Sequence, residues 1–470
     1  MDASGVANAN GSAITFGGSG GGTTYYIDPT YGSGGDGQQA TPFDSWSDVT
    51  WAAGNTYLQK RGTISTVQIQ PTTGGSAGNY ITIGAYGTGA KPIIASASGH
   101  GVYLGYASTP KSYFIIENLD IRPADSGIVG STASDTNHLL IDSCDITGAL
   151  NGGITIVSTG TDIEIKYCTI TDTGLSTASV YAINFTGTGA VHVHHCTVTN
   201  VGRAGTADNS DGISLGGTVG GNGSIIEYCT VTGQNGSNGS GIDLAHSLNT
   251  DNLSISATAR YNDVSDCEGR CIGVMGDSLL GSRILIYDNY LHDSYTGIHC
   301  YEKCTIQIYN NTIVNNTYAG CRFSGSDTDG PRTGYFYNNI VSGNELYKMA
   351  HHPTGASGGP YTLTCDYNDY YASSSMVLRY NGTSYSTVAT WAAARGDDSH
   401  PSPAIGNPLL TGYVLASGSP CINAGTTLSD VTTDIRGVIR PQGSAYDIGA
   451  YEFKNATLWN CGLSGGGGVR

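Results

Sequence analysis

The sequence predicts an all-β chain wound into a solenoid, a β-helix in which short strands stack in parallel from coil to coil. One short apolar phrase returns ten times between Tyr113 and Tyr371, at spacings of 22 to 33 residues and without helical periodicity. The third residues of these phrases are Leu119, Cys144, Cys168, Cys196, Cys229, Asn262, Asn289, Asn311, Asn339 and Asn368. A repeat of this length, built from short strands, is typical of a solenoid.

Each repeat contains a second apolar pulse, usually begun by Gly or Cys, as in Gly212–Leu215 and Gly297–Cys300. Both pulses alternate apolar and polar residues, which is the period of a half-buried strand. Two or three such strands per coil, stacked in parallel, would repeat like residues every ~4.8 Å. Asn amides can then pass hydrogen bonds from coil to coil, and Cys can fill the same interior position.

Over residues 113–372 this architecture resembles the right-handed parallel β-helix superfamily of pectate lyases, polygalacturonases and phage tailspikes. The resemblance implies a single-stranded right-handed parallel β-helix with an N-terminal cap and a C-terminal closing segment. It also implies a polysaccharide as the partner, either bound or cleaved.

Composition agrees with a coil-rich β protein, since Gly reaches 70 of 470 residues and charged residues only 12%. Tight turns between strands need Gly and Asn for positive φ. The net charge of −17 argues against nucleic acid as a partner. No apolar run is long enough to span a membrane. No secretory signal is visible after Met1, so we expect either a removed signal or export inside a virion, and an extracellular or virion location.

Five segments are expected along the chain. In the second segment Trp51 and Leu58 are expected to cover the open end of the core, because an uncovered coil exposes strand edges. The segments are a flexible Gly-rich arm (1–24), the N-terminal cap and first coils (25–112), the β-helix (113–372), a C-terminal capping segment (373–453) and a tail (454–470).

Two features of the capping segment are predicted. One short helix is expected at Trp391–Asp397. Its last phrase resembles the closing segment that lies along the final coils of right-handed β-helix domains. We interpret its Asp434, Arg436, Arg440 and Asp447 as a structural ion-pair set.

Cofactor binding is weakly indicated. The CxxxC pairs Cys267/Cys271 and Cys300/Cys304, and the four Cys at the repeat position, are interpreted as packed core thiols in preference to a disulfide or zinc. The acidic loop Asp28–Gly37 is interpreted as a turn, with a Ca²⁺ site as the open alternative. His192 and His194 share a strand face, but without a third ligand we expect exposed histidines and no metal.

Candidate chemistry gathers on one outward strip. If the second strands point Ile213, Ile242, Ile272, Ile298 and Cys321 inward, the following residues point outward. The first outward column is then Ser214, Asp243, Gly273, His299 and Arg322; a second, two residues before the interior position, is Asp211, Ser240, Arg270, Thr296 and Ala319; a third is Gly216, Ala245, Met275, Tyr301 and Ser324. Loop residues Asp208, His246, Glu268, Asp277, Glu302 and Lys303 border them.

Two catalytic mechanisms fit this strip. Asp211 and Asp243, with Cα atoms expected ~8 Å apart, could act as the acid and base of an inverting glycosidase. Asn209–Leu215 resembles the catalytic Asn-Thr-Asp segment of polygalacturonases, although the other signatures of that family are absent. In the second mechanism, β-elimination on a uronic acid, His299, Tyr301 or Lys303 would be the base. Arg270 and Arg322 would then hold the substrate carboxylate.

The predicted substrate-binding residues are Asp208, His246, Glu268, Tyr301 and Lys303. An alternative function needs no catalysis: a structural or adhesive protein such as a phage fibre or surface decoration, assembled with its own copies or with virion partners. The strip would then be an ordinary solvated surface.

Overall fold

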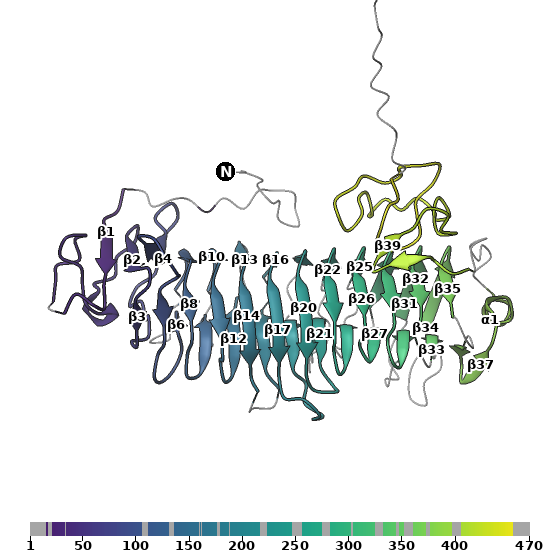
Figure 1. Cartoon of the computed structure of the whole chain (residues 1–470), viewed down its shortest axis with the longest axis horizontal. Helices are drawn as coiled ribbons and strands as arrows, with labels where there is room; N and C mark the ends of the chain where they lie inside the picture. The colour runs from purple at the N-terminus through teal and green to yellow at the C-terminus, as the bar shows by residue number, and fades with distance from the viewer. Residues whose placement is uncertain are drawn as a thin grey trace, which may run out of the picture.

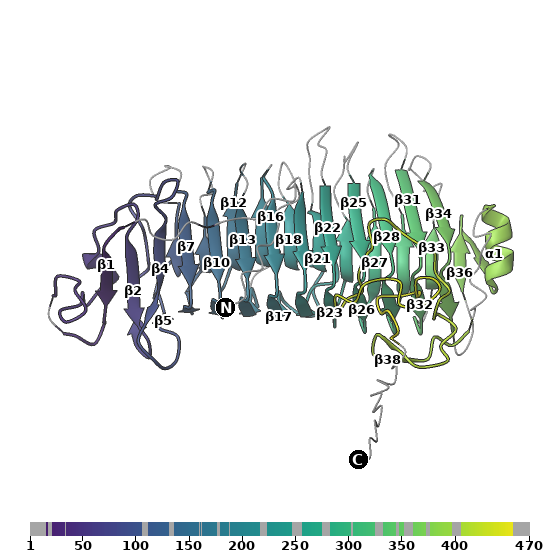
Figure 2. The same cartoon turned by 90° about the horizontal axis from the view of Figure 1, so that it is seen from above.

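The computed structural model describes residues 16, 21–32, 34–105, 111–130, 136–158, 160, 162–175, 179–187, 189–216, 223–246, 256–274, 283–301, 304–324, 332–344, 347–351, 361–372, 377–396 and 406–454, with the backbone alone at 245, 246, 332, 349, 351 and 361. Within these ranges the chain forms a rod of stacked coils (Figures 1 and 2). Strands of successive coils pair in parallel in three long sheets.

Sheet A has thirteen strands among the described residues and begins each coil. Its strands are β1 (Thr24–Ile27), β2 (Thr56–Lys60), β4 (Ile81–Tyr86), β7 (Phe114–Glu117), β10 (Leu139–Asp142), β13 (Ile163–Lys166), β16 (Val191–His194), β19 (Ser224–Glu227), β22 (Ser256–Arg260), β25 (Arg283–Tyr287), β28 (Thr305–Tyr309), β31 (Arg332–Tyr337) and β34 (Tyr361–Asp366).

From β2 onward, each strand of sheet A is followed by a strand of sheet B. Its strands are β3 (Ile64–Ser65), β5 (Ile93–Ile94), β8 (Asp120–Ile121), β11 (Asp145–Thr147), β14 (Thr169–Thr173), β17 (Thr197–Val201), β20 (Thr230–Gln234), β23 (Asp263–Ser265), β26 (Tyr290–His292), β29 (Thr312–Val314), β32 (Ile340–Ser342) and β35 (Asp369–Tyr371).

Sheet C completes the coil and carries the predicted strip. Its strands are β6 (Val102–Tyr103), β9 (Ser126–Val129), β12 (Gly152–Val157), β15 (Tyr181–Thr186), β18 (Asp211–Gly216), β21 (Ser240–His246), β24 (Arg270–Val274), β27 (Thr296–Cys300), β30 (Ala319–Phe323), β33 (Tyr347–His351), β36 (Leu378–Tyr380) and the antiparallel β37 (Thr383–Tyr385).

The ten repeat positions are equivalent rungs inside the rod, as the sequence predicts. Registers on both sides fix this alignment: Asp142 pairs with Lys166 before the rung, and Asp145 pairs with Thr169 after it. All ten rung side chains are buried. From Asn262 to Asn368 each side-chain amide donates to the next rung, at N···O distances of 3.0, 2.9, 3.0 and 3.1 Å. The four rung cysteines, together with Cys267, Cys271 and Cys300, are buried thiols.

A left-handed turn precedes every rung, and the sequence did not lead us to expect it. The φ angles there lie between 51° and 59°, a region that bulky residues rarely adopt. The ten turn residues are Asn118, Ser143, Tyr167, His195, Tyr228, Tyr261, Asp288, Asn310, Asn338 and Tyr367. Their side chains also interact between coils, because the rings of His195, Tyr228 and Tyr261 stack at 5.0 and 4.8 Å. The same bend therefore joins sheet A to sheet B in coil after coil.

Replacing Asn311 with Ala is expected to lower the free energy of unfolding by about 2 kcal/mol, because buried backbone and amide groups lose their partners. Asn311 donates to the carbonyls of Ile286 and Tyr309 and to Asn339, and it accepts from the backbone N–H and amide of Asn289. Chemical denaturation measures the change. Asn311→Cys is the matched control and should cost less, since Cys occupies this rung in four other coils. A loss below about 0.5 kcal/mol in Asn311→Ala would contradict the role of the amide.

Both ends of the core are covered by aromatic side chains. At the first coils Trp51 packs with Trp46 from a short 3-10 helix (Trp46–Asp48) and with Tyr57, with ring centroids 6.1 and 4.5 Å away. The prediction for Leu58 was wrong: Tyr57 points inward on β2, so its neighbour Leu58 points outward and is only partly buried. At the far end the helix α1 (Val388–Arg395) buries Trp391 against Tyr370 (Figure 2).

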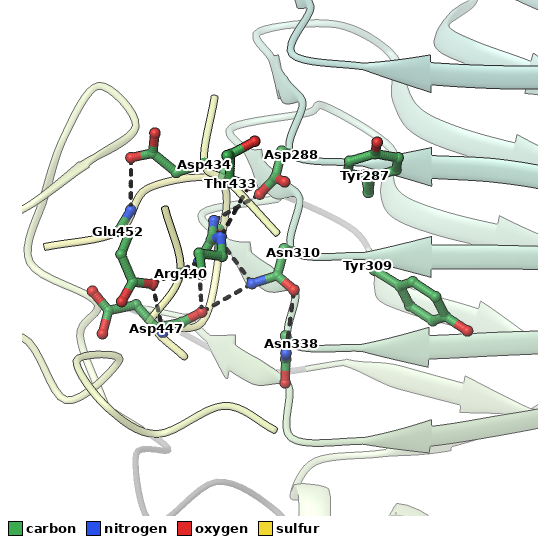
Figure 3. Close-up of polar contacts among 12 residues, drawn as sticks. Tyr287, Asp288, Tyr309, Asn310, Asn338, Thr433, Asp434, Arg440, Asp447 and Glu452 are labelled. Atoms are coloured by element: carbon green, nitrogen blue, oxygen red, sulfur yellow. Dashed lines mark hydrogen bonds and ion pairs between the residues drawn. The ribbon is translucent and has the colours of Figure 1, made fainter. Parts of the chain in front are cut away.

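The segment 406–454 lies along the side of the last coils, with a small hairpin of β38 (Leu410–Thr411) and β39 (Val414–Leu415) (Figure 1). Of the predicted ion-pair set, Arg440 lies at the contact of this segment with the rod (Figure 3). Asp447 accepts the backbone N–H groups of Asn423 and Phe453 and forms no ion pair among the described residues. Arg440 is completely buried and pairs with Asp288 of the rod at 2.6 Å and with Glu452 at 3.0 Å. Arg436 pairs with Asp434 at 2.7 Å. The closing segment is thus fastened by buried charges. No helix of the described residues could cross a membrane.

Candidate functional site

The register of sheet C aligns the first two predicted columns. Ser214 is level with Asp243, Asp243 with Gly273, Gly273 with His299, and His299 with Arg322. In the second column Ser240 is level with Arg270, and Arg270 with Thr296. The third column breaks, because an irregularity after Ser214 pairs Gly216 with His246 and not with Ala245. Met275, Asp277, Glu302 and Lys303 lie outside the described residues.

The strip is only partly exposed: Asp243 and His299 are buried, whereas Arg322 is partly exposed. A hollow of about 580 Å³ opens over its central coils, lined by Ser237, Asn238, Glu268, Gly269, Arg270, Tyr295, Thr296, His299 and Arg322. A second hollow of about 470 Å³ adjoins it and shares Ser237, Glu268 and Tyr295. Three of the five predicted catalytic residues, Arg270, His299 and Arg322, therefore meet at one concave surface.

His299 lies in this hollow between two cations. It is 8% exposed, and its Nε2 lies 2.8 Å from Ser324 Oγ. Burial, together with the charges of Arg270 and Arg322, holds the pKa of His299 well below its usual value. His299 is therefore a neutral imidazole at neutral pH.

Arg270 is held in place by a hydrogen bond in the same hollow. Its Nη1 donates to the carbonyl of Asn238 at 2.9 Å. Burial lowers the pKa of Arg270, and the carboxylates of Asp243 and Asp211 oppose that shift. A guanidinium stays charged in such surroundings. The two aspartates thus offset part of the desolvation of Arg270.

Asp211 and Asp243 do not line either hollow. Each is 1% exposed, and Asp211 accepts a 2.7 Å hydrogen bond from the backbone N–H of Ser240. Because Ser214, and not Asp211, is level with Asp243, the aspartates differ by three residues along the strand and one coil across it. In a straight strand that is ~11 Å between Cα atoms, longer than the expected ~8 Å. Both burial and spacing disfavour a glycosidase pair.

The predicted substrate-binding residues have different positions. Glu268 lines both hollows, but its carboxylate accepts the backbone N–H groups of Gly205 and Gly236 at 2.9–3.0 Å, so it fastens two loops. Asp208 accepts from Thr206 Oγ1 at 2.7 Å. The rings of Tyr301 and His299 are nearly perpendicular, at 84°, with their centroids 6.0 Å apart. Of His246 the structure describes the backbone alone, and Lys303 lies outside the described residues.

The interpretation of His192 and His194 as exposed side chains was wrong. They are 4% and 3% exposed, with stacked rings 4.3 Å apart. His192 bonds Glu227 and His194 bonds Glu164, both at 2.9 Å. Within the described part of the chain, no three His, Cys, Asp or Glu side chains gather in a way that could hold a metal ion. In the loop Asp28–Gly37, Asp28 bonds Thr30 and pairs with Lys60 at 2.8 Å, as a turn residue would.

The buried Glu227 makes stability depend on pH. Burial raises its pKa, but His192 and Arg260 lower it more strongly, to about 2. A depressed carboxyl pKa adds stability above the unfolded value near 4.5, and this stability is lost as pH falls toward 2. We expect Glu227→Gln to remove on the order of 2 kcal/mol of that change, measured by denaturation at pH 5 and below.

Glu117→Gln serves as a control of opposite sign. Burial and Asp142 raise the pKa of Glu117, so in the native protein this carboxyl lowers stability as pH rises. An identical pH profile for wild type and Glu227→Gln would contradict the assignment.

Comparison with known proteins supports the fold. The family model described as a right handed beta helix region matches residues 59–219. A lacto-N-biosidase of family GH136 from Eubacterium ramulus superposes with a TM-score of 0.51 at 14% identity, over 73% of this chain and 68% of that one. The pectate lyase Pel9A gives 0.47 at 14% identity, over 92% and 96% of the two chains. An alginate lyase from Paenibacillus sp. gives 0.42 at 16% identity, over 72% and 98%. No curated protein sequence matches the chain. The fold is a right-handed parallel β-helix.

Proposed function

We propose that this right-handed parallel β-helix protein binds a uronate-containing polysaccharide in the hollow over Arg270, His299 and Arg322, and cleaves it by β-elimination. The single observation that carries the proposal is a buried histidine placed between two arginines in the larger hollow. A neutral imidazole can accept a proton, and two guanidinium groups can neutralise the carboxylate beside which that proton is lost.

The reaction can be written with these groups. With Nε2–H donated to Ser324 Oγ, Nδ1 of His299 carries the lone pair. Nδ1 takes the proton from C5 of the uronate, the carbon that bears the carboxylate held by Arg270 and Arg322. The C5–H electrons form the C4=C5 double bond, the bond from C4 to the glycosidic oxygen breaks, and that oxygen takes up a proton from solvent. The products are an unsaturated uronate and a new chain end.

Glycoside hydrolysis by Asp211 and Asp243 is the weaker proposal, because both carboxylates are buried outside the hollow. The same burial favours a second candidate: a protein that binds the polysaccharide without cleaving it, such as a fibre or surface component, alone or assembled with its own copies or with a virion. We therefore propose a location outside the cell or on a virion, from which the protein could meet such a polymer.

A polysaccharide panel tests the proposal. Pectate, alginate and a neutral glucan are incubated with the protein, and the product is followed by ultraviolet absorbance and by reducing ends. Elimination raises both signals, hydrolysis raises reducing ends alone, and a binding protein raises neither but is retained by the immobilised polymer. A signal on the neutral glucan with none on the uronates would overturn the assignment.

A further inference from the structure

A row of tyrosines borders the hollow on the side of the later coils. Tyr295 lines the hollow, and Tyr318 and Tyr347 follow on the next two coils. Backbone hydrogen bonds tie the three together, because the N–H of Tyr318 donates to Tyr295 and that of Tyr347 donates to Tyr318, both at 2.8 Å. The row is thus built into the coil repeat.

The rings of the row form a platform. Tyr295 and Tyr318 are stacked, with centroids 4.9 Å apart and planes inclined by 13°, while Tyr347 meets Tyr318 edge-on at 5.5 Å. Tyr295 is 47% exposed, and the other two are partly buried. A tyrosine that served only to fill the core would have no reason to keep half of its surface in water.

Arginines accompany the rings. The guanidinium carbon of Arg322 lies 5.9 Å from the centre of the Tyr318 ring, and that of Arg379 lies 5.5 Å from the Tyr347 ring. Arg379 also donates to the hydroxyl of Tyr347 at 3.2 Å. The Nε atoms of both arginines are buried and make no hydrogen bond in the described part of the chain. Both side chains are nevertheless partly exposed, so a ligand can approach their guanidinium groups.

The strand register sets the spacing of the two arginines along the rod. Arg322 is level with Ala350, and Ala350 with Arg379, so the two arginines stand two coils apart in the column of His299. Two coils correspond to ~10 Å. One pyranose ring is about as long as one coil is thick. A 1,4-linked chain that runs along the rod would therefore meet an aromatic ring or a guanidinium at each sugar.

We infer that the row Tyr295–Tyr318–Tyr347, with Arg322 and Arg379, is an extended subsite for an acidic glycan lying parallel to the solenoid axis. The inference rests on the proposed function and adds the course of the chain and its class. Sugar rings stack on Tyr295 and Tyr318. The carboxylates of neighbouring sugars in the same chain meet Arg322 and Arg379. The ligand is a polymer of consecutive uronates that extends beyond the hollow.

Binding measured without turnover tests the subsite. Calorimetric titration of galacturonate and mannuronate trisaccharides and hexasaccharides is carried out in a His299→Gln background. Tyr318→Ala and Arg379→Gln are each expected to weaken hexasaccharide binding about tenfold, and to change the binding of a trisaccharide in the hollow less than about twofold. Tyr31→Ala, at a tyrosine 40% exposed near the other end of the rod, is the matched control and should bind as the parent. A neutral glucose hexasaccharide should not bind.

The outcomes separate the subsite from the catalytic proposal. Hexasaccharide binding that is unchanged in both Tyr318→Ala and Arg379→Gln overturns the subsite, even if the wild type cleaves uronates. Failure of every uronate oligosaccharide to bind overturns it as well. Cleavage lost in His299→Gln while the tyrosine variants lose hexasaccharide affinity supports both. Tyr318→Phe, which keeps the ring, should bind as the parent, and thermal unfolding of each variant shows that the coil is intact.

Discussion

Replacing Arg440 with Met is expected to lower the free energy of unfolding by about 3–5 kcal/mol, because it leaves two carboxylates buried without their cation. Asp288 and Glu452 are both completely buried, and Arg440 pairs with each of them. Burial lowers the pKa of Arg440, but the charges of Asp288 and Glu452 outweigh that shift and raise it overall. Guanidinium denaturation measures the loss, and limited proteolysis should cut the segment 406–454 first.

Two controls frame this experiment. Arg436→Met removes an arginine of the same segment whose side chain is 33% exposed, so its loss should stay near 1 kcal/mol. The triple variant Arg440→Met, Asp288→Asn, Glu452→Gln removes the stranded charges and should recover part of the stability. If Arg440→Met and Arg436→Met destabilise equally, the buried pairs do not fasten the closing segment.

The coil repeat was predictable because its signal is local and repeated. A rung residue such as Asn311 occupies the same inward position in coil after coil. The spacing between successive rung residues therefore reveals the alignment that the register confirms. The outward columns follow from it, since alternation along a strand fixes the direction of His299 once Ile298 points inward. The fold and the order of the outward columns can therefore be predicted from the repeat alone.

Burial of the outward face could not be predicted in the same way. Alternation says that Asp243, which directly follows Ile242, points away from the core, but not that it is 1% exposed. His192 and His194 were misjudged for the same reason, because their partners Glu164 and Glu227 come from neighbouring coils. The irregularity after Ser214 also leaves no mark in the sequence pattern. Contacts between coils decide exposure, and these depend on side-chain length and local register.

The tyrosine row was missed although the sequence carries its signal. In sheet C, Tyr295 directly precedes β27 and Tyr318 directly precedes β30, one repeat later. Tyr347 is the first residue of β33, the next strand of that sheet. The corresponding positions of the two earlier coils are Gly239 and Gly269. A search for aromatic residues at the period of the rungs would have found the row, whereas a search for titratable residues passed over it.

Replacing His299 with Ala is expected to reduce cleavage of a uronate polymer by about 10²–10⁴-fold, the usual contribution of a general base. Hexasaccharide binding should change little, because the arginines and tyrosines that hold the chain remain. Since the pKa of His299 lies well below its ordinary value near 6.5, the wild type should keep its base form as pH falls from 8 to 6.5, and lose activity only below that range.

Replacing Ser324, the hydrogen-bond partner of His299, tests the same catalytic role in a second way. Ser324→Ala removes the hydroxyl 2.8 Å from Nε2, so it should lower kcat by about tenfold through a misplaced imidazole, with KM unchanged. His138→Ala, at a partly exposed histidine of an early coil, should leave both constants unchanged. Cleavage by His299→Ala within about fivefold of wild type would remove His299 from the chemistry. Arg270 and Arg322 would then be left to explain binding alone.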